Sequence, residues 1–416
     1  GVMQLDDITK HSALNIGTLG HIDHGKTSLT RAITNTWTDR HSESIKRNMT
    51  IKLGYADAII KKCEKCEGAS AYTTLDKCTG CEGTPKPVMR ISMLDAPGHE
   101  TLMATAIAGS SVIDAILFVI AANEPAPMPQ TREHLMIINI LGIKNVIIVQ
   151  TKIDIVGREA ALAHEAQIRK FIKGSIIENA PIIPVMPNLG VNVDVVLEMI
   201  AKMQLPKRDL ESDPIMYVVR SFDVNKPGAD ATKLSGGVIG CAVVKGRFKI
   251  GEEIEIRPGM RLGGKSKKET YEPIITIIKS MTNGTEQIED AIPGGLIGIS
   301  TEVDPTFTKT DGLVGNMVGH TGKLPAVISE FSMKYIKLKR DDIPEQHMQE
   351  NEPLIMGMGT ATVLGYVKKS KKDNLTIELK HPISAERGTK VAIMRNIGHR
   401  WRLTGYGQLG AQQGSK

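Results

Sequence analysis

GHIDHGKT occupies residues 20–27 and is the most informative stretch of this 416-residue chain. It matches the phosphate-loop pattern G-x-x-x-x-G-K-[ST], and it lies between an apolar run at residues 14–19 and a segment of helical periodicity. Glycines let consecutive backbone amides face phosphate oxygens, and the N-terminus of the following helix adds favourable charge. In such a loop Lys26 reaches the β and γ phosphates and Thr27 ligates Mg²⁺. The predicted phosphate-contacting residues are Asp23, His24, Gly25, Lys26, Thr27 and Ser28.

Apolar runs alternate with amphipathic segments through the first half of the chain. Short buried strands are predicted at residues 14–19, 89–94, 115–121, 146–149 and 182–185. This alternation is typical of a mostly parallel α/β domain, predicted over residues 1–205.

The second half of the chain has the texture of β hairpins. A charged, proline-bracketed linker is predicted at residues 206–214. The strictly alternating EIEIR at residues 253–257 predicts a strand that ends at Pro258-Gly259. Two all-β barrels are therefore predicted, over residues 215–323 and 324–416.

Composition restricts the class of protein. At roughly 100–200 residues per domain, the length indicates two to four domains. The formal net charge of +6 permits an anionic partner, and an aromatic content of 4% argues against a platform that stacks unpaired bases. No apolar run approaches the roughly 18 residues of a membrane span, so we expect no membrane partner. Five cysteines in so long a chain favour a reducing, cytoplasmic setting.

Two further motifs follow the phosphate loop in the order that a nucleotide switch requires. Asp95, in DAPGH at residues 95–99, is predicted to hold Mg²⁺ through water, and the Gly98 amide to sense the γ phosphate. Thr50 completes the predicted Mg²⁺ shell. In TKID at residues 151–154, Asp154 can accept from guanine N1 and its exocyclic amine, which indicates GTP. Thr151 and Lys152 complete this predicted base-binding motif.

Four of the five cysteines form two C-x-x-C pairs within residues 63–81. This spacing predicts a structural Zn²⁺ site with thiolate at every position, and disulfides or a redox pair are the alternative. The predicted zinc ligands are Cys63, Cys66, Cys78 and Cys81. Cys241 lies in an apolar strand and is interpreted as core packing.

The phosphate loop, DAPGH and the two trailing β domains together resemble the translational GTPases. Longer stretches narrow the resemblance to the γ subunits of archaeal and eukaryotic translation initiation factor 2. These stretches lie at residues 49–56, 121–125, 129–134, 220–228 and 400–407. The resemblance covers nearly the whole chain and implies a P-loop GTPase domain followed by two β barrels.

The resemblance also implies an activity and partners. The family binds GTP or GDP with Mg²⁺ and, in its GTP form, binds initiator methionyl-tRNA and delivers it to the small ribosomal subunit. GTP hydrolysis promotes release, and the subunit forms a heterotrimer with α and β subunits. In the family pattern His99 positions the attacking water, while Asp23 and Asn48 hold a second Mg²⁺.

The base pocket departs from the family pattern at two places. Thr151 replaces the asparagine of Asn-Lys-x-Asp, and Met186-Pro187, followed by Asn188, stands where the family has Ser-Ala. Proline has no amide hydrogen to donate to guanine O6. One lost hydrogen bond costs on the order of 1 kcal/mol, so we expect weakened but guanine-selective binding that depends on Asp154.

Other functions remain open at this stage. The chain could be an elongation-type or selenocysteine-specific aminoacyl-tRNA carrier, or a scaffold with an impaired nucleotide switch. Basic clusters in the last domain are candidate RNA contacts. They comprise Lys334, Lys337, Lys339 and Arg340, the lysines of residues 368–372, and Arg395, Arg400 and Arg402.

Overall fold

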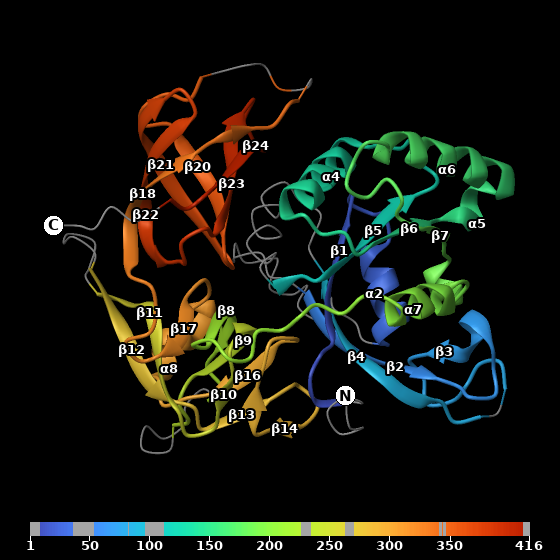
Figure 1. The fold of residues 1–416 in the computed structure, drawn as a ribbon, viewed down its shortest axis with the longest axis horizontal. Coiled ribbons are helices and arrows are strands. Elements are labelled where there is room, and N and C mark those ends of the chain that lie inside the picture. The colour runs from blue at the N-terminus through green and yellow to red at the C-terminus, as the bar shows by residue number, and fades with distance from the viewer. Residues whose placement is uncertain are drawn as a thin grey trace. The chain divides into compact units, whose positions relative to one another are not determined.

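In the computed structural model the chain forms two compact units, and the boundary between them in the sequence lies between residues 207 and 208 (Figure 1). It describes residues 9–35, 54–81, 83–95, 112–225, 234–262, 270–340, 343 and 347–410. The first unit carries the α/β region, and the second carries two curled antiparallel sheets.

The first unit is built on a seven-stranded sheet. Its strands are β1 (Leu14–Gly20), β2 (Gly54–Lys62), β3 (Tyr72–Thr73), β4 (Lys86–Asp95), β5 (Ala115–Ala121), β6 (Val146–Thr151) and β7 (Ile182–Pro184). Its helical segments are α2 (Lys26–Thr34), η2 (Gly68–Ala71), α4 (Pro129–Leu141), α5 (Ile153–Val156), α6 (Arg158–Ile172), η4 (Pro187–Leu189) and α7 (Val193–Ala201). The strand order is β3-β2-β4-β1-β5-β6-β7. The run from β4 to β7 is parallel, whereas β2 is antiparallel to β4 and β3 to β2. Strands β2 and β3 were not predicted from the sequence.

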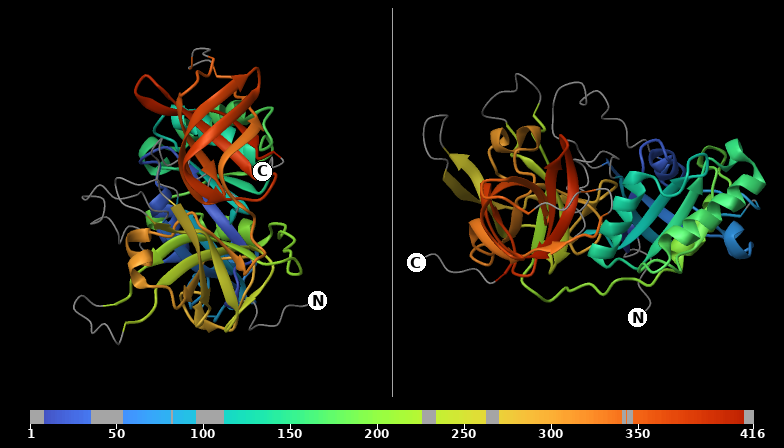
Figure 2. Two further views of the ribbon diagram at one scale, coloured as in Figure 1. Left: turned by 90° about the vertical axis from the view of Figure 1, so that its left-hand side faces the viewer. Right: turned by 90° about the horizontal axis from the view of Figure 1, so that it is seen from above.

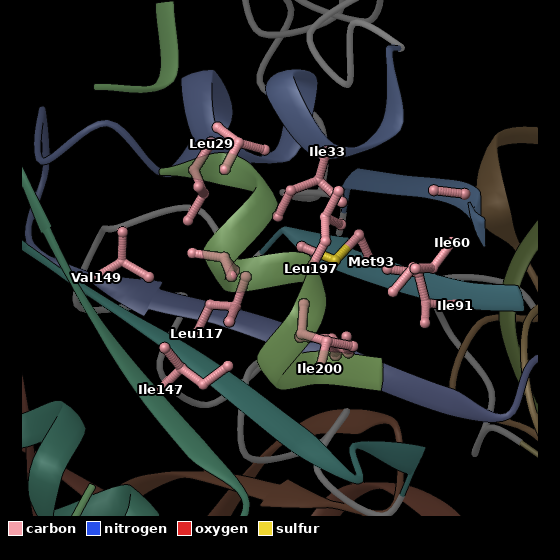
Figure 3. Close-up of a cluster of buried hydrophobic side chains, with 14 of the residues drawn as sticks. Leu29, Ile33, Ile60, Ile91, Met93, Leu117, Ile147, Val149, Leu197 and Ile200 are labelled. Atoms are coloured by element: carbon pink, nitrogen blue, oxygen red, sulfur yellow. The ribbon is translucent and has the colours of Figure 1, made fainter. Parts of the chain in front are cut away.

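Helices cover both faces of this sheet, and successive residues of each strand point to opposite faces. On β5, Leu117 and Val119 join the core formed with α2 and α7, whose Leu29, Ile33 and Leu197 lie over the strands in Figure 3. Phe118 points the other way and meets the ring of His134 on α4. Because β4, β1, β5, β6 and β7 run parallel, their carboxyl ends lie along one edge of the sheet, where ligands bind in open α/β sheets.

The first curled sheet of the second unit has eight strands in the order β12-β11-β17-β8-β9-β16-β13-β14. Strands β12 and β13 are separated only by residues 278–279, yet they lie far apart in this order, so the chain closes the sheet upon itself. The strands here are β8 (Ile215–Phe222), β9 (Val238–Lys245), β11 (Glu253–Leu262), β12 (Thr270–Ile277), β13 (Ser280–Thr282), β14 (Gln287–Ile288), β16 (Ile297–Ser300) and β17 (Met317–His320), with the separate pair β10 (Phe248–Lys249) and β15 (Asp290–Ala291). The segments α8 (Pro305–Thr308) and η6 (Lys309–Asp311) connect β16 to β17.

The prediction that a strand ends at Pro258-Gly259 was wrong. Strand β11 continues to Leu262, and its pairing with β12 shifts register between Ile256 and Met260. The two predicted turn residues therefore form a bulge inside the strand. Gly259 has φ 87°, and a Cβ there would lie 2.0 Å from the carbonyl oxygen of Glu272. Only glycine fits this close approach of β11 to β12.

The second curled sheet has seven strands in the order β18-β22-β21-β20-β23-β24-β19. They are β18 (Val327–Lys334), β19 (Ile336–Lys337), β20 (Pro353–Met358), β21 (Ala361–Lys371), β22 (Asn374–Ser384), β23 (Lys390–Ile397) and β24 (Arg400–Gln408). Only Tyr335 separates β18 from β19, so one segment supplies both ends of the sheet and closes it (Figure 2). Each curled sheet encloses its own apolar core.

The fold class predicted from the sequence is confirmed: a parallel-sheet domain precedes curled antiparallel sheets. Cys241 is fully buried in the core of the first curled sheet, as predicted. None of the helices in the described ranges combines the length and apolar character needed to cross a bilayer.

Candidate nucleotide site and cysteine cluster

The predicted phosphate loop joins β1 to α2 at the carboxyl edge of the parallel strands. Asp23 has φ 60°, and Gly25, the residue that caps α2, has φ 90°. The Lys26 ammonium donates to the carbonyl oxygens of Gly20 and His21, at 2.9 and 2.7 Å. Lys26 is thus buried inside the loop, with Thr27 and Ser28 following on the first turn of α2. This arrangement of a lysine and a helix N-terminus fits a phosphate.

The structure brings the predicted base-binding motif next to the phosphate loop. Thr151, at the end of β6, is buried, and its hydroxyl donates to the carbonyl oxygen of His24 at 2.6 Å. Lys152 follows in a left-handed conformation with φ 57°, and Asp154 is exposed on α5. The threonine that departs from the family pattern therefore links the base-binding strand to the phosphate loop.

The segment after β7 forms a tight turn. Met186 and Val191 exchange two backbone hydrogen bonds of 3.2 Å, while Pro187 opens η4 and Asn188 is exposed. The amide of Leu189 donates to the Met186 carbonyl at 3.1 Å. The predicted pocket wall is thus ordered, but Pro187 supplies no amide hydrogen.

Several predicted residues cannot be placed. Asn48, Thr50, Gly98 and His99 lie outside the described residues. The backbone of Asp95 ends β4 opposite Thr18, and its side chain is likewise outside the described parts.

Two residues near the loop, Glu124 and His134, were not predicted from the sequence as part of the site. The buried His24 ring contacts Glu124 through Nε2, at 2.9 Å from Oε2. Burial lowers the pKa of His24, and the hydrogen bond from His24 lowers the pKa of Glu124. His134 on α4 is fully buried, and burial lowers its pKa to about 3. Glu124 lies within AANEP at residues 121–125, which served only as a mark of resemblance.

The four predicted zinc ligands converge. Their sulfur atoms all lie within 4.8 Å of one another, and the closest pairs are 3.4 to 3.5 Å apart. Tetrahedral coordination with Zn–S bonds of about 2.3 Å requires sulfur separations of roughly 3.8 Å, close to these values. All four are free thiols. The backbone amide of Gly80 lowers the pKa of Cys78 to about 7, whereas the neighbouring thiols raise the pKa of Cys66 to about 12, so Cys78 is the readier of the two to offer a thiolate to a metal.

The cysteine cluster lies at the tip of a β hairpin. Strands β2 and β4 pair down to Lys62 and Lys86, and Cys63 follows directly. Gly83 packs against two of the thiols, since a Cβ there would lie 3.1 Å from Cys63 Sγ and 3.2 Å from Cys81 Sγ. The donor set and its close packing are compatible with zinc.

The basic clusters of the last domain are only partly brought together. A cavity of about 490 Å³ is lined by residues from all three clusters, namely Lys337, Lys339, Arg340, Lys372 and Arg395. Arg395 is also bound by Glu352, through its Nη2 at 2.9 Å. Lys334 lines a different groove, and Lys368 pairs with Glu330.

Comparisons with known proteins agree with this architecture. Residues 11–206 match the family of the elongation factor Tu GTP binding domain, and residues 329–409 match the C-terminal family of initiation factor eIF2 gamma. Among solved structures, the chain is similar to a bacterial selenocysteine-specific elongation factor, with a TM-score of 0.71 and 22% identity. That similarity covers 98% of this chain and 60% of that chain. Elongation factor SelB from Methanococcus maripaludis gives a TM-score of 0.70 at 22% identity, over 97% of this chain and 80% of that one.

Sequence relatives are much closer. Translation initiation factor 2 subunit gamma of Methanococcus vannielii is 48% identical over 96% of this chain and 98% of its own length. The protein of the same name from Methanothermobacter thermautotrophicus is 46% identical over 95% of this chain and 98% of its own length. These matches span both units described above. The chain therefore belongs to the family of translation initiation factor 2 γ subunits, which are translational GTPases.

Proposed function

We propose that this GTPase, in its GTP state, binds initiator methionyl-tRNA and delivers it to the small ribosomal subunit, and that GTP hydrolysis promotes release. The observation that carries the proposal is the phosphate loop, with Lys26 buried inside it, in a chain 48% identical to an initiation factor γ subunit. We propose the α and β subunits of the same factor as its partners, in the cytoplasm.

The proposed nucleotide site uses the residues named from the sequence. Asp23, His24, Gly25, Lys26, Thr27 and Ser28, with Gly98, would surround the phosphates. Thr27, Thr50 and Asp95 would hold Mg²⁺, which neutralises charge on the β and γ phosphates. Asp23 and Asn48 would hold a second Mg²⁺, and His99 would orient the attacking water.

Guanine would be read by Asp154, beside Thr151, Lys152 and the turn at residues 186–188. The described geometry supports this order of parts, because Thr151 donates directly to the phosphate loop. A threonine at this position can therefore tie the base-binding strand to the loop. Affinities for GTP and ATP measured side by side test the base preference, and equal values would contradict it.

The cysteine cluster would hold a structural Zn²⁺ with all four thiolates. A closed thiolate site has no position for a substrate, so its contribution is folding energy rather than chemistry. The metal would fasten the hairpin tip beyond β2 and β4. We propose that this stiffened tip serves as a surface for tRNA or for a partner subunit.

RNA contact through the last domain is supported by the basic cavity, where cations from three separate sequence segments meet. Phosphate contacts of this kind weaken with salt. The charge of Arg395 is neutralised in part by Glu352, so Arg395 has less charge to offer a phosphate.

The decisive test is filter binding of initiator and elongator methionyl-tRNA with GTP, with GDP and without nucleotide. We expect tight binding of the initiator species with GTP only. Equal binding of the two tRNAs would favour an elongation-type or selenocysteine-specific carrier. Equal tRNA affinity with GTP, with GDP and without nucleotide would favour a scaffold with an impaired switch.

A further inference from the structure

Residue 24 of the phosphate loop is held from two strands at once. Its carbonyl oxygen accepts from the hydroxyl of Thr151, the last residue of β6, at 2.6 Å. Its ring Nε2 lies 2.9 Å from Glu124 Oε2, just past β5, and the ring packs beside the carbonyl oxygen of Val119 on β5. The His24 side chain is 1% exposed, so these contacts are shielded from water.

The loop needs such restraint because its backbone is strained at Asp23, directly before His24. Asp23 adopts φ 60° and Gly25 adopts φ 90°, both in the left-handed region. A non-glycine residue in that region is strained and persists only when its surroundings enforce it, whereas glycine adopts the region freely. The contacts of His24 supply that enforcement next to the strained Asp23.

Glu124 is the member of this arrangement that comes from outside the loop motifs. A carboxylate oxygen can only accept, so Nε2 of His24 carries the hydrogen in the contact. A hydrogen bond with one charged partner is about twice as strong as a neutral one. The Glu124 side chain is 31% exposed, so it reaches the buried ring from the surface. The interaction therefore connects a surface carboxylate to the interior of the phosphate loop.

The surroundings of Glu124 also tie it to the base-binding motif. The positive charge of Lys152, in TKID, interacts favourably with the negative charge of Glu124. Glu124 is not among the predicted nucleotide-binding residues. Any effect of Glu124 on nucleotide binding would therefore be transmitted through His24.

We propose that Glu124 is a positioning residue that holds the phosphate loop in its nucleotide-binding conformation through His24, and thereby slows nucleotide release. The proposal rests on nucleotide binding at residues 20–28. Without Glu124, the loop relaxes more often, and bound GDP dissociates faster while its association rate changes little.

The test is stopped-flow dissociation of a fluorescent GDP analogue from the full, zinc-loaded chain. Losing the hydrogen bond to the charged Glu124 weakens the restraint on the loop, and part of the effect should reach the nucleotide. We expect Glu124→Ala to raise the dissociation rate roughly tenfold. Glu124→Gln keeps an accepting oxygen at the same reach and should stay within about threefold of the parent chain. Glu159→Ala, at an exposed position on α6, is the matched control and should leave the rate unchanged.

A double-mutant cycle identifies the route. If Glu124 acts through His24, then His24→Ala combined with Glu124→Ala should dissociate GDP no faster than His24→Ala alone. Additive effects would overturn the proposal, as would a parent-like rate in Glu124→Ala. If Glu124→Ala does not fold, Glu124→Asp, one methylene shorter, should raise the rate several-fold, and a parent-like rate there would equally refute it.

Failure of the underlying site is distinguishable. A parent chain that binds no GDP analogue contradicts the proposed nucleotide site itself. A parent chain that binds it while every Glu124 variant releases it at the parent rate contradicts only the role of Glu124.

Discussion

Replacing Gly259 with alanine should damage the first curled sheet far more than the same replacement at Gly251. Both glycines have φ 87°, and both flank or belong to β11. A Cβ at Gly251 meets no atom within 4 Å, whereas one at Gly259 lies 2.0 Å from the Glu272 carbonyl oxygen. The pair separates backbone strain, which both variants share, from steric overlap, which only Gly259→Ala creates.

The magnitudes follow from these two terms. Left-handed backbone costs an alanine about 1–2 kcal/mol, and this is the whole expected effect of Gly251→Ala. Overlap at Gly259 forces β12 away from β11, and overpacking of this kind adds about 1–3 kcal/mol. Gly259→Ala should therefore be less stable than Gly251→Ala by about 2 kcal/mol, roughly 30-fold in an opening equilibrium.

The assay is amide hydrogen exchange of the β11 and β12 segments, because the chain has two units and a single unfolding midpoint would mix them. Exchange should be roughly 30-fold faster in Gly259→Ala than in Gly251→Ala, with β20 to β24 of the last sheet as an internal reference. Equal loss of protection in the two variants would refute the reasoning, because it would show that β11 and β12 can separate at no cost.

Three further predictions concern the sites. Zinc content should be near one per chain in the parent and in Cys241→Ser, and near zero in Cys66→Ser; equal metal in all three would remove the case for the cysteine site. His99→Ala should slow GTP hydrolysis by roughly 100-fold or more with GDP affinity nearly unchanged, and an unaltered single-turnover rate would exclude His99 from the reaction. Burial lowers the pKa of His134 from 6.5 to about 3. Between these two values the unfolded chain binds a proton at His134 and the folded chain does not, so the stability of the fold decreases as the pH falls below about 6.5. This effect reaches about 2 kcal/mol at pH 5, so His134→Gln should flatten the acid-side fall in melting temperature of the first unit, and identical slopes would contradict it.

The sequence predicted the parts of the site that depend on local rules. A phosphate loop has a fixed order of strand, glycine-bearing turn and helix. The motif GHIDHGKT, with the apolar run before it, predicted each of these three parts. The two C-x-x-C pairs likewise predicted a cluster of thiols, because the two cysteines of such a pair can bind the same side of one metal ion. The curled sheets were predicted from alternation and turn residues, and the roles of the nucleotide-contacting residues stay predictions.

The parts that the sequence did not predict depend on distant pairing. Strand β2 becomes a strand because β4 offers it an open edge, and its own Ala56, Ala58 and Ile60 are a weak alternating signal. The Pro258-Gly259 bulge looks like a turn locally, but β12 continues to pair on its far side. Glu124 meets His24 across one hundred residues of chain, and neither residue indicates the other in the sequence.

The closure of the last sheet has a consequence for how this subunit coexists with other chains. An open sheet presents a row of unpaired amide and carbonyl groups that can recruit a strand from another molecule. Here β18 and β19 form one continuous segment that pairs with β22 and with β24, so this segment closes the sheet. A single backbone cut at Tyr335 would remove the covalent link between the two borders of the sheet. The cut protein should therefore self-associate more than the intact chain, although it would lose no residue.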